Sequence, residues 1–484
     1  MDRDSPATLD AGALGLGESV VMGVAGTAPA FSLAATTATL VATVGALAPA
    51  SLLYCGLIMF GVTLSYQQLN RLQPSAGACY TWASEIFHPV LGFFAGWTLL
   101  VASAVFMVSG TIPAATATLL LFDPVLAERP PVVTLVAAGW LLAVSVVVIK
   151  GIKLTSYTQV AMTLVELGVL AAIVLAALVR APRPLAHPLS PAMLWPSGFT
   201  PQLFANGALV ALFFFWGWDV TANLTEETRD PAHAPGRGAL TAMVIVLALF
   251  MTFVIACQAV LSDQEIRSAG TNIVFALATR LFPRPWNYLA VLAVMLSTVG
   301  TLETSILQFT RTLYAKGRDG LLHPRYAELH RTWRTPWVAT AVIASFGLLL
   351  LALSAYVNSV GQIIQDSVNA IGFQVAFYYG LAGFACAWHC RRGAARAPGK
   401  LLLLVLWPAC SAAFLWFMGL YSIPSFDLAT RVVALGGIAV GAVPLLCSAP
   451  NTACASACGG IGKALCCAAC AASSKRVSQA SFNR

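Results

Sequence analysis

Charged side chains are scarce in this chain. Only 10% of its 484 residues are Asp, Glu, Lys or Arg, whereas 58% are hydrophobic. A soluble protein of this length needs far more charge to cover its surface, so a soluble globular fold is excluded. The apolar residues form continuous runs of about 20 residues, long enough for helices to cross a bilayer, and lack the alternation of a β-barrel. We therefore predict an all-α polytopic membrane protein embedded in the lipid bilayer.

Several functional signatures are also missing. No Gly-x-x-x-x-Gly-Lys-Ser/Thr loop occurs, so transport driven by ATP is not expected. The six His residues are scattered over loops and span ends, which argues against a membrane-embedded transferase and against an enzyme in general. The first 18 residues are acidic and carry no cleavage site, so they do not form a signal peptide. We predict no cofactor, no metal and no nucleic-acid partner.

The twelve cysteines fall into two groups. Six lie in apolar runs, where cysteine behaves as a small hydrophobic residue. The other six lie between Cys447 and Cys470, in a stretch rich in Ala, Cys and Ser. Their spacing matches no zinc pattern and includes no His. We therefore interpret residues 449–484 as a disordered cytoplasmic tail of low complexity.

Twelve membrane spans can be drawn along the apolar runs. With the N-terminus inside, 20 of the 27 Lys and Arg residues fall in cytoplasmic segments and 7 in outer segments. This bias predicts that both termini are cytoplasmic in a plasma (inner) membrane protein, and it accounts for the net charge of +8. The predicted spans are 19–43, 48–69, 89–121, 131–149, 155–179, 203–227, 238–261, 287–314, 337–356, 360–389, 401–421 and 430–448.

Two of these spans are interrupted. The first contains Gly23–Pro29, GVAGTAP, and the sixth contains Phe213–Asp219, FFFWGWD. Glycine permits the backbone to leave the helix, and a charge at membrane depth usually marks function. The interrupted spans are five spans apart, an odd number, so their halves have opposite orientations. That arrangement is typical of an inverted repeat with a binding site between two broken helices.

Four stretches together carry a family resemblance: Gly23–Leu33, Ser75–Trp97, Gly217–Pro231 and Arg311–Pro336. From about residue 18 to 420 the chain resembles the amino acid–polyamine–organocation (APC) superfamily of transporters. The resemblance implies a leucine-transporter-type fold of five plus five inverted helices, with broken helices 1 and 6 and two further C-terminal helices. One departure concerns the first break, where many members have Gly-x-Gly and a large aliphatic residue but this chain has AGTAP.

The predicted organisation then has five parts. It comprises an N-terminal segment (1–18), repeat 1 (19–179), repeat 2 (203–389), two additional helices (401–448) and the tail (449–484).

The first break is predicted to bind the carboxylate of an amino acid. An unwound helix exposes N–H donors, and the following half-helix adds positive potential. Gly26 and Thr27 are the expected donors, with Gly23 and Ala25 in the same break and Pro29 in the first turn of the restarted helix. The alternative is a simple kink made by glycine and proline.

The second break is predicted to bind the substrate ammonium. The carbonyls of Phe214, Phe215 and Trp216 lose their helical partners where the helix stops at Gly217. Aromatic rings here could stack on a cation. The resemblance assigns the gate over the substrate to Phe213. The alternative is that these aromatics pack against lipid, since four in a row cannot all face one site. Ser103 and Tyr80 are weaker candidates for substrate contact.

Three buried carboxyls are candidates for charge pairing or coupling. Asp219 suits a cationic substrate group, a gating hydrogen bond or a proton relay, or else caps the restarted half-helix. Glu166 lies midway along the fifth span, and burial favours the protonated form that a proton carrier needs. The resemblance places Glu166 where some members use a lysine in place of a sodium site. Glu303 either adds negative charge to the site or makes an interhelical hydrogen bond.

Proton coupling is therefore the first choice. Sodium coupling stays open, because Ser297, Thr298 and Thr301 could supply oxygen ligands. Glu226 and Glu227 are expected to be solvated or salt-bridged near Arg229. The interior is acidic overall, which favours a neutral or cationic substrate.

The sequence thus predicts a secondary active transporter of amino acids or related amines that works by alternating access, as a monomer or homodimer. The alternatives are an amine or polyamine exchanger of the same fold and an amino acid sensor without transport activity.

Overall fold

The computed structural model describes residues 8–182, 184–188, 190–354 and 360–447. The predicted Cys-rich tail lies outside these residues. Among the described residues, eleven helical stretches are long and apolar enough to cross a membrane. The first, Leu16–Leu72, has 57 residues and would be about 86 Å long as one helix, roughly twice the thickness of a bilayer. It contains the first two predicted spans, so these stretches correspond to the twelve spans of the sequence.

Repeat 1 contains eight helices. They are α1 (Leu16–Gly26), α2 (Pro29–Val44), α3 (Ala48–Leu72), α4 (Cys79–Ile86), α5 (Pro89–Phe122), α6 (Pro124–Ala127), α7 (Pro130–Ile149) and α8 (Ile152–Arg180).

Repeat 2 also contains eight helices. They are α9 (Pro201–Ala211), α10 (Val220–Asn223), α11 (Ala234–Val260), α12 (Asp263–Ala269), α13 (Ile273–Leu281), α14 (Leu289–Arg318), α15 (Trp337–Ser354) and α16 (Val360–Ala394).

The remaining helices are α17 (Pro398–Leu401), α18 (Trp407–Ser422), α19 (Leu428–Arg431), α20 (Gly437–Val440) and α21 (Ala442–Cys447). The short helices α4, α6, α12 and α13 lie in connections that the sequence left without structure.

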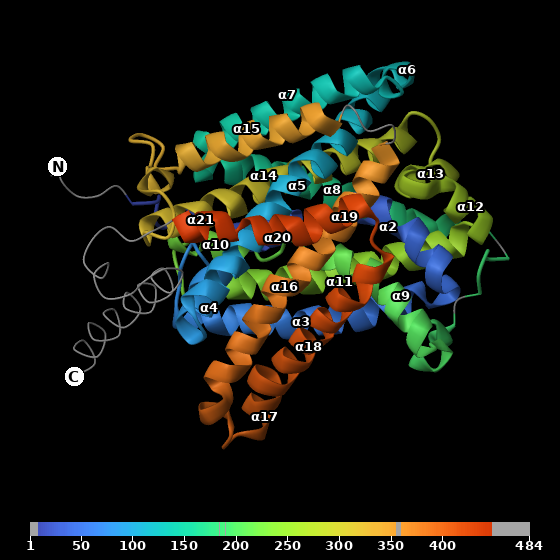
Figure 1. Ribbon diagram of the computed structural model, residues 1–484. Helices are drawn as coiled ribbons and strands as arrows, with labels where there is room; N and C mark the ends of the chain where they lie inside the picture. The colour runs from blue at the N-terminus through green and yellow to red at the C-terminus, as the bar shows by residue number, and fades with distance from the viewer. Residues whose placement is uncertain (1–7, 183, 189, 355–359, 448–484) are drawn as a thin grey trace, which may run out of the picture.

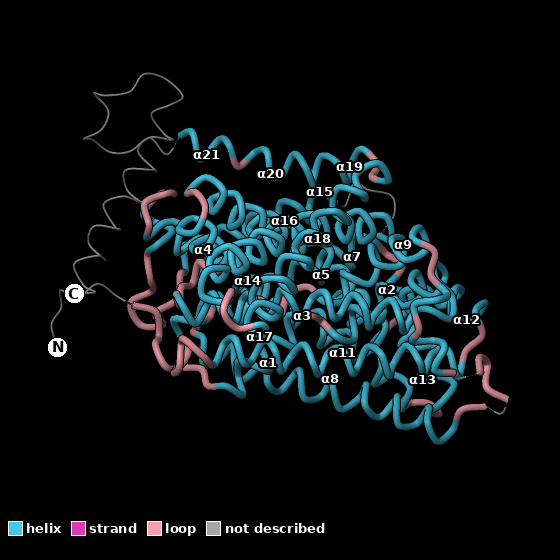
Figure 2. The backbone as a smooth tube through the Cα atoms, turned by 90° about the horizontal axis from the view of Figure 1, so that it is seen from below, coloured by secondary structure: helices cyan, strands magenta, loops and turns pink. Residues whose placement is uncertain are grey.

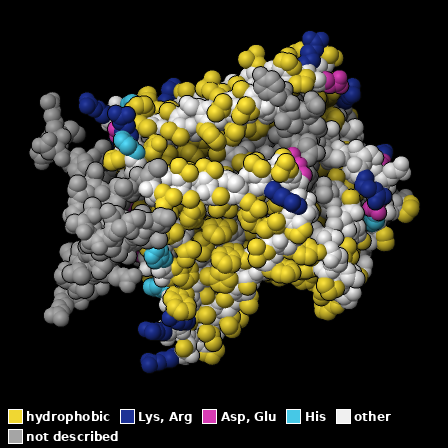
Figure 3. All heavy atoms as spheres, viewed as in Figure 1, with side chains coloured by type: hydrophobic (Ala, Val, Ile, Leu, Met, Phe, Trp, Pro, Cys, Tyr) yellow, Lys and Arg dark blue, Asp and Glu magenta, His cyan; other side chains and the backbone are white. Residues whose placement is uncertain are grey.

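The bundle has two ends and a hydrophobic waist. The helices α4, α10 and α21 lie on one side, which we call the terminal end, and α6, α12 and α13 lie on the opposite side, the far end (Figure 1). On the face in Figure 3, hydrophobic side chains cover the middle while most charged side chains lie near the two ends. This is the surface of a helical protein that spans a bilayer.

Long helices in the centre carry the core. In the helix Asp366–Ala394, 78% of the most apolar stretch of 18 residues is buried inside the protein. In Leu428–Leu446 the corresponding share is only 17%. Seen from below, α8 runs along one edge of the bundle and α19–α21 run along the opposite edge (Figure 2). The residues around the two breaks, 22–30 and 213–223, are all buried.

The two broken helices run in opposite directions. Leu14, just before α1, accepts from Arg229 N at 2.8 Å and donates to Glu227 O at 3.0 Å, just after α10. The start of the first broken helix thus touches the end of the second. This antiparallel arrangement is the one that the inverted repeat requires.

Candidate substrate and coupling site

The second broken helix parts where the sequence predicts. α9 continues into a 3₁₀ turn at Leu212–Phe215, and the helix resumes as α10 at Val220. Between them Gly217 has φ 103°, a conformation that favours glycine. Among the described residues, no donor bonds to the carbonyl oxygen of Phe215 or of Trp216. The break therefore leaves acceptors of the kind that an ammonium group needs.

The first broken helix parts within the predicted stretch Gly23–Pro29, at its C-terminal end. α1 stays helical through Gly26 and α2 begins at Pro29, so the break consists of Thr27 and Ala28. Proline lacks an N–H and disfavours a right-handed helical conformation in the residue before it. Ala28 accordingly has φ 48°. Pro29, more than the glycines, sets the position of the break.

The predicted carboxylate donors need correction for this reason. Gly23, Ala25 and Gly26 belong to the last turns of α1, and Thr27 caps it. The N–H and the hydroxyl of Thr27 both donate to Val24 O, at 3.1 and 2.7 Å. In this conformation Thr27 has its donors turned into α1, so the assignment of Thr27 as a carboxylate donor is wrong here.

The glycines serve close packing of the backbone. A Cβ on Gly26 would lie 2.1 Å from Gly217 O, and a Cβ on Gly217 would lie 2.0 Å from Gly26 O. The two breaks are therefore in direct backbone contact, as the prediction of one paired site requires. A Cβ on Gly23 would lie 2.8 Å from Ala242 Cβ on α11, so Gly23 brings α1 close to α11.

The first turn of α2 supplies the N–H donors that the sequence placed in α1. Ala30 N donates to Glu166 Oε1 at 2.8 Å, and Phe31 N donates to Ser297 Oγ at 3.2 Å. Glu166 is 2% exposed and comes from α8, as the coupling prediction requires. A proline at the first helical position could have revealed these donors, since the next amides have no partner within the helix.

Further oxygens gather at the same break. Thr301 Oγ1 donates to Ala25 O at 2.7 Å, which joins α14 to the last turn of α1. Thr298 Oγ1 bonds to carbonyls of its own helix, Val294 O and Met295 O. Of the proposed sodium ligands, Ser297 and Thr301 therefore face the first break and Thr298 does not.

The four consecutive aromatic residues point in different directions. Phe214 and Phe215 are fully buried against Phe250 of α11, with ring centroids 5.0 and 5.7 Å away. The ring of Phe214 thus packs away from the break, and the predicted contact of its carbonyl with substrate stays a prediction. Phe213 and Trp216 line a cavity of about 90 Å³ among α9, α16 and α18. The gating role of Phe213 stays a prediction.

Asp219 lies on the terminal side of the second break and is fully buried. Its Oδ1 accepts from Tyr379 Oη at 2.7 Å, and its Oδ2 has no hydrogen-bond partner among the described residues. Although Asp219 precedes α10, its side chain makes no capping bond. The capping alternative is thus contradicted, and the carboxylate keeps one oxygen for another partner.

An aromatic cluster surrounds this carboxylate. Tyr66 lies edge-on to Trp218 and Tyr379, with ring centroids 5.0 and 5.7 Å apart. Tyr378 Oη accepts from Trp216 Nε1 at 3.0 Å. These tyrosines are not among the site residues predicted from the sequence. The adjacent Tyr378 and Tyr379 within the tenth apolar run were the available signal, because a buried phenol needs a hydrogen-bond partner.

Glu303 does not line the substrate site. Its Oε1 accepts from Thr158 Oγ1 of α8 at 2.9 Å, so the interhelical alternative holds. Two residues along a helix turn a side chain by about 200°, so Glu303 faces away from the break that Thr301 contacts. Ser103 is fully buried on α5, and its hydroxyl has no partner among the described residues. Its role in substrate contact stays a prediction.

A cavity opens on the far side of the breaks. Its volume is about 400 Å³, and side chains from α2, α5, α13 and α14 line it, including Phe31, Ala117 and Val294. Phe31 lies edge-on to Phe106, and Phe106 lies edge-on to Trp216, with centroids 6.3 and 5.4 Å apart. This chain of rings joins the cavity to the second break.

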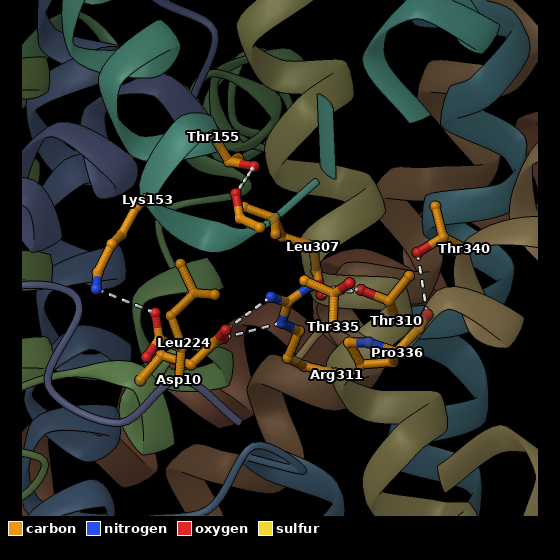
Figure 4. A network of polar contacts seen from close by, with 12 residues as sticks. Asp10, Lys153, Thr155, Leu224, Leu307, Thr310, Arg311, Thr335, Pro336 and Thr340 are labelled. Carbon is orange, nitrogen blue, oxygen red and sulfur yellow. Dashed lines mark hydrogen bonds and ion pairs between the residues drawn. The ribbon is translucent and has the colours of Figure 1, made fainter. Parts of the chain in front are cut away.

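The terminal side is closed by a buried ion pair. Arg311 Nε and Nη2 donate to Glu227 Oε2 and Oε1 at 3.0 and 2.9 Å, and both side chains are fully buried (Figure 4). Beside it, Glu226 accepts from Ala76 N at 2.9 Å and pairs with Arg318. The predicted salt-bridged role of the two glutamates is confirmed, but Glu227 is not solvated.

Other contacts strengthen this closure. Asp10 pairs with Lys153 at 3.4 Å (Figure 4). Tyr80 Oη donates to Asp319 Oδ2 at 2.9 Å, so Tyr80 belongs to the closure and not to the substrate site. Burial and the neighbouring Asp319 carboxylate raise the pKa of Tyr80 well above its usual range, so it remains a donor. Lys316 Nζ donates to Phe93 O at 2.7 Å.

Comparison with known proteins gives a consistent assignment. The family model described as "Amino acid permease" matches residues 14–443. The serine/threonine exchanger SteT of Bacillus subtilis is 23% identical over 341 residues, which are 68% of this chain and 72% of that protein. The branched-chain amino acid permease BcaP of the same organism is 26% identical (60% and 64%). The low-affinity putrescine importer PlaP of Escherichia coli is 24% identical (60% and 63%).

Proposed function

We propose, from the premise that this chain belongs to the amino acid permease family, that it carries amino acids or related amines across the plasma membrane by proton-coupled alternating access. A secondary transporter is the general function that the family and the relatives support, and none of the relatives named above is an enzyme. The coupling ion, the membrane and the orientation are the new parts of the proposal.

The observation that carries the proposal is the contact between the two breaks. Gly26 meets Gly217 in direct backbone contact; the first amides of α2 follow the first break in the chain, and the unpaired carbonyls of Phe215 and Trp216 directly precede Gly217. Amide donors bind a carboxylate, and carbonyl oxygens bind an ammonium group. An amino acid carries both groups on one carbon atom, which fits two such half-sites in contact.

Glu166 supplies a reason for proton coupling. Its carboxylate accepts from Ala30 N, at the positive end of α2 where the carboxylate of a substrate would bind. Protonation neutralises Glu166 and weakens this hydrogen bond, since charge-assisted hydrogen bonds are the stronger ones. The amide is then released to the substrate. Proton and substrate binding therefore favour each other.

The same geometry weighs against sodium. The groups that face Glu166 and Ser297 from α2 are N–H donors at the positive end of a helix, which repel a cation. A sodium dependence of uptake at constant pH would favour the alternative, with Ser297 and Thr301 as ligands.

The terminal end is assigned to the cytoplasm. Of the 27 Lys and Arg residues, 20 fall on that side when the spans alternate. The far cavity then opens to the outside, and the Glu227–Arg311 ion pair closes the cytoplasmic side. The conformation is one that accepts substrate from outside.

Asp219 favours neutral or cationic substrates over acidic ones. Its free Oδ2 lies beside aromatic rings, a setting that suits an ammonium group. Among the relatives, PlaP is named as a putrescine importer, whereas SteT and BcaP are named for neutral amino acids. An exchanger of amines with the same fold is the second candidate function, on the strength of this carboxylate.

The test is transport by purified protein in liposomes. Labelled serine, leucine and putrescine are offered with and without an inward proton gradient, and counterflow is measured at equal pH. We expect counterflow for at least one compound and accumulation driven by the gradient. Binding without counterflow would indicate a sensor. Counterflow without accumulation would indicate an exchanger and would contradict proton coupling.

A further inference from the structure

A second buried carboxyl lies outside the substrate site. Glu303 on α14 is 2% exposed and faces α8. Thr158 Oγ1 donates to Glu303 Oε1 at 2.9 Å. With its amide nitrogen turned toward acceptors, Gln159 donates to Glu303 Oε2 and to Gly300 O at 3.2 Å. Both oxygens of the carboxyl are thus held by neutral donors.

Glu303 and Glu166 lie along one interface. α8 and α14 run in opposite directions, and polar side chains, all buried except the half-buried Thr158, face each other between them. We call this the α8–α14 seam, formed by Thr158, Gln159, Thr163, Glu166, Ser297 and Glu303. On α8 the spacing is four and then three residues from Gln159 to Glu166, which is one helix face, while Leu164 and Val165 beside it are exposed.

The two carboxyls are close enough for a relay. Phe31 N bonds Ser297 on α14 while Ala30 N bonds Glu166, so Ser297 and Glu166 lie at the same level. Glu303 is six residues beyond Ser297, about 9 Å along the helix toward the terminal end. Between them, Thr163 Oγ1 lies 3.4 Å from the Gln159 amide. A Cβ on Gly300 would lie 2.6 Å from that amide, so the glycine makes room for it.

No described cation neutralises Glu303. The helices α2, α5, α7 and α15 contain no Asp, Glu, Lys, Arg or His. On α8 and α14, Lys153 pairs with Asp10, Arg311 with Glu227 and Arg318 with Glu226, and Lys316 donates to Phe93 O. The other charged groups near α8 and α14 have partners elsewhere or are exposed. Glu18 bonds to Gly15 N, Asp219 to Tyr379, Arg180 to Leu281 O and Arg280 to Glu265. Arg237 and Arg325 are exposed.

Burying an ionised carboxylate without a cation costs free energy, so protonation of Glu303 is favourable in this place. Thr158, at the terminal end of the seam, is only half-buried. Glu303 therefore lies between Glu166 and the terminal end. The substrate route past Asp219 and Tyr379 lies at the second break, and none of the contacts of Glu303 reaches it.

We propose that Glu303 is a second proton-binding carboxyl, through which protons leave Glu166 for the terminal end along the α8–α14 seam. This inference rests on the proposed proton coupling at Glu166. In each step one O–H bond breaks and another forms: the Glu166 carboxyl gives its proton to the seam hydroxyls, and the Glu303 carboxylate takes one up and later releases it. Substrate and proton then use separate routes to the same side.

The first test compares exchange with accumulation. Glu303→Gln keeps a side chain of the same shape but cannot titrate, and it is reconstituted in full-length protein with labelled serine, leucine and putrescine. We expect accumulation driven by a proton gradient to fall at least about tenfold, because a proton-transfer group is lost. Counterflow at equal pH should stay within about twofold, because substrate contacts are intact. Glu303→Asp, which still titrates, should retain part of the accumulation.

Three outcomes separate the proposals. If Glu166→Gln abolishes accumulation but Glu303→Gln does not, the relay is wrong and proton coupling at Glu166 stands. If Glu303→Gln lowers counterflow and accumulation equally, the residue is only an interhelical contact and the relay is also wrong. If the wild-type protein shows counterflow but no accumulation, both proposals fail.

A second measurement needs no substrate. Infrared spectra of the wild-type protein and Glu303→Gln are compared over a pH titration, with Thr252→Val as control, because Thr252 is exposed on α11 and bonds only carbonyls of its own helix. A carboxyl band that titrates in the wild type and in the control but is absent from Glu303→Gln would support the relay. Identical titrating bands in all three would overturn it.

Discussion

The two ends of the bundle are separated from the breaks by different kinds of contact. At the terminal end, the fully buried ion pair of Glu227 with Arg311 is joined by backbone pairing of Leu14 and by the bond of Tyr80 to Asp319. At the far end there is a cavity of about 400 Å³, and the rings of Phe31 and Phe106 separate it from the second break.

This difference indicates which closure is harder to open. Apolar contacts between rings are non-directional and can slide with little loss. A buried ion pair is directional, and separating its partners leaves each buried charge without compensation. In an alternating-access cycle, the terminal end therefore presents the steeper step, and substrate binding at the breaks has to offset it.

The largest effect is expected where the two halves meet. Gly217→Ala would place a Cβ 2.0 Å from Gly26 O at φ 103°. Backbone strain and overpacking together cost about 2–6 kcal/mol, so we expect loss of counterflow and a lower melting temperature. Gly168→Ala is the control, because a Cβ there meets nothing within 4 Å. Wild-type counterflow in Gly217→Ala would show that the breaks need not touch.

The next effect distinguishes two neighbouring glutamates at the terminal end. Glu227→Gln leaves the buried Arg311 without its carboxylate, which costs about 3–5 kcal/mol. Glu226 and its partner Arg318 are partly exposed, at 25% and 38%, so Glu226→Gln should cost only about 0–1 kcal/mol. Thermal unfolding in detergent measures both.

A double variant provides the control for this comparison. Glu227→Gln combined with Arg311→Gln removes both charges, so part of the lost stability should return. Equal destabilisation by the two single variants would contradict the view that burial gives the Glu227–Arg311 pair its role.

Much of the fold was predictable from local features. Apolar runs gave the spans because a helix in lipid must satisfy its own backbone, and Gly217 marked the second break because its φ of 103° favours glycine. The opposite orientation of the broken helices followed from counting spans. These features depend on short stretches of sequence.

The site was less predictable, because it depends on contacts between distant segments. The first break is confined to Thr27 and Ala28, since Pro29 governs it more than the glycines do. Phe214 packs on Phe250, 36 positions later, which no local pattern reveals. Whether Glu303 faces the breaks or α8 depends on the rotation of α14, which is fixed by its neighbours. Glu166 was found because an isolated carboxyl in an apolar run is rare.

A smaller and selective effect is expected at Asp219, between the two ends. Asp219→Asn removes the charge but keeps an acceptor for Tyr379. A hydrogen bond to a charged group contributes about 1.5 kcal/mol or more, so the KM for putrescine should rise at least about tenfold. Neutral amino acids should be affected much less. Equal losses for leucine and putrescine would show that Asp219 holds the gate through Tyr379 without contacting a cationic group.

The smallest effect should appear at the far cavity, on one face of the membrane only. Ala117→Leu narrows the cavity between α5 and α2, and hindered entry should raise the KM there about threefold, or about 0.7 kcal/mol. The KM measured from the terminal side, in vesicles of opposite orientation, should not change, because substrate from that side reaches the breaks without first passing Ala117. Ala172→Leu, in a groove between α8 and α13 outside this cavity, is the control. An equal rise on both faces would mean that the far cavity is not an entry route, and the contrast between the two ends would then concern stability alone.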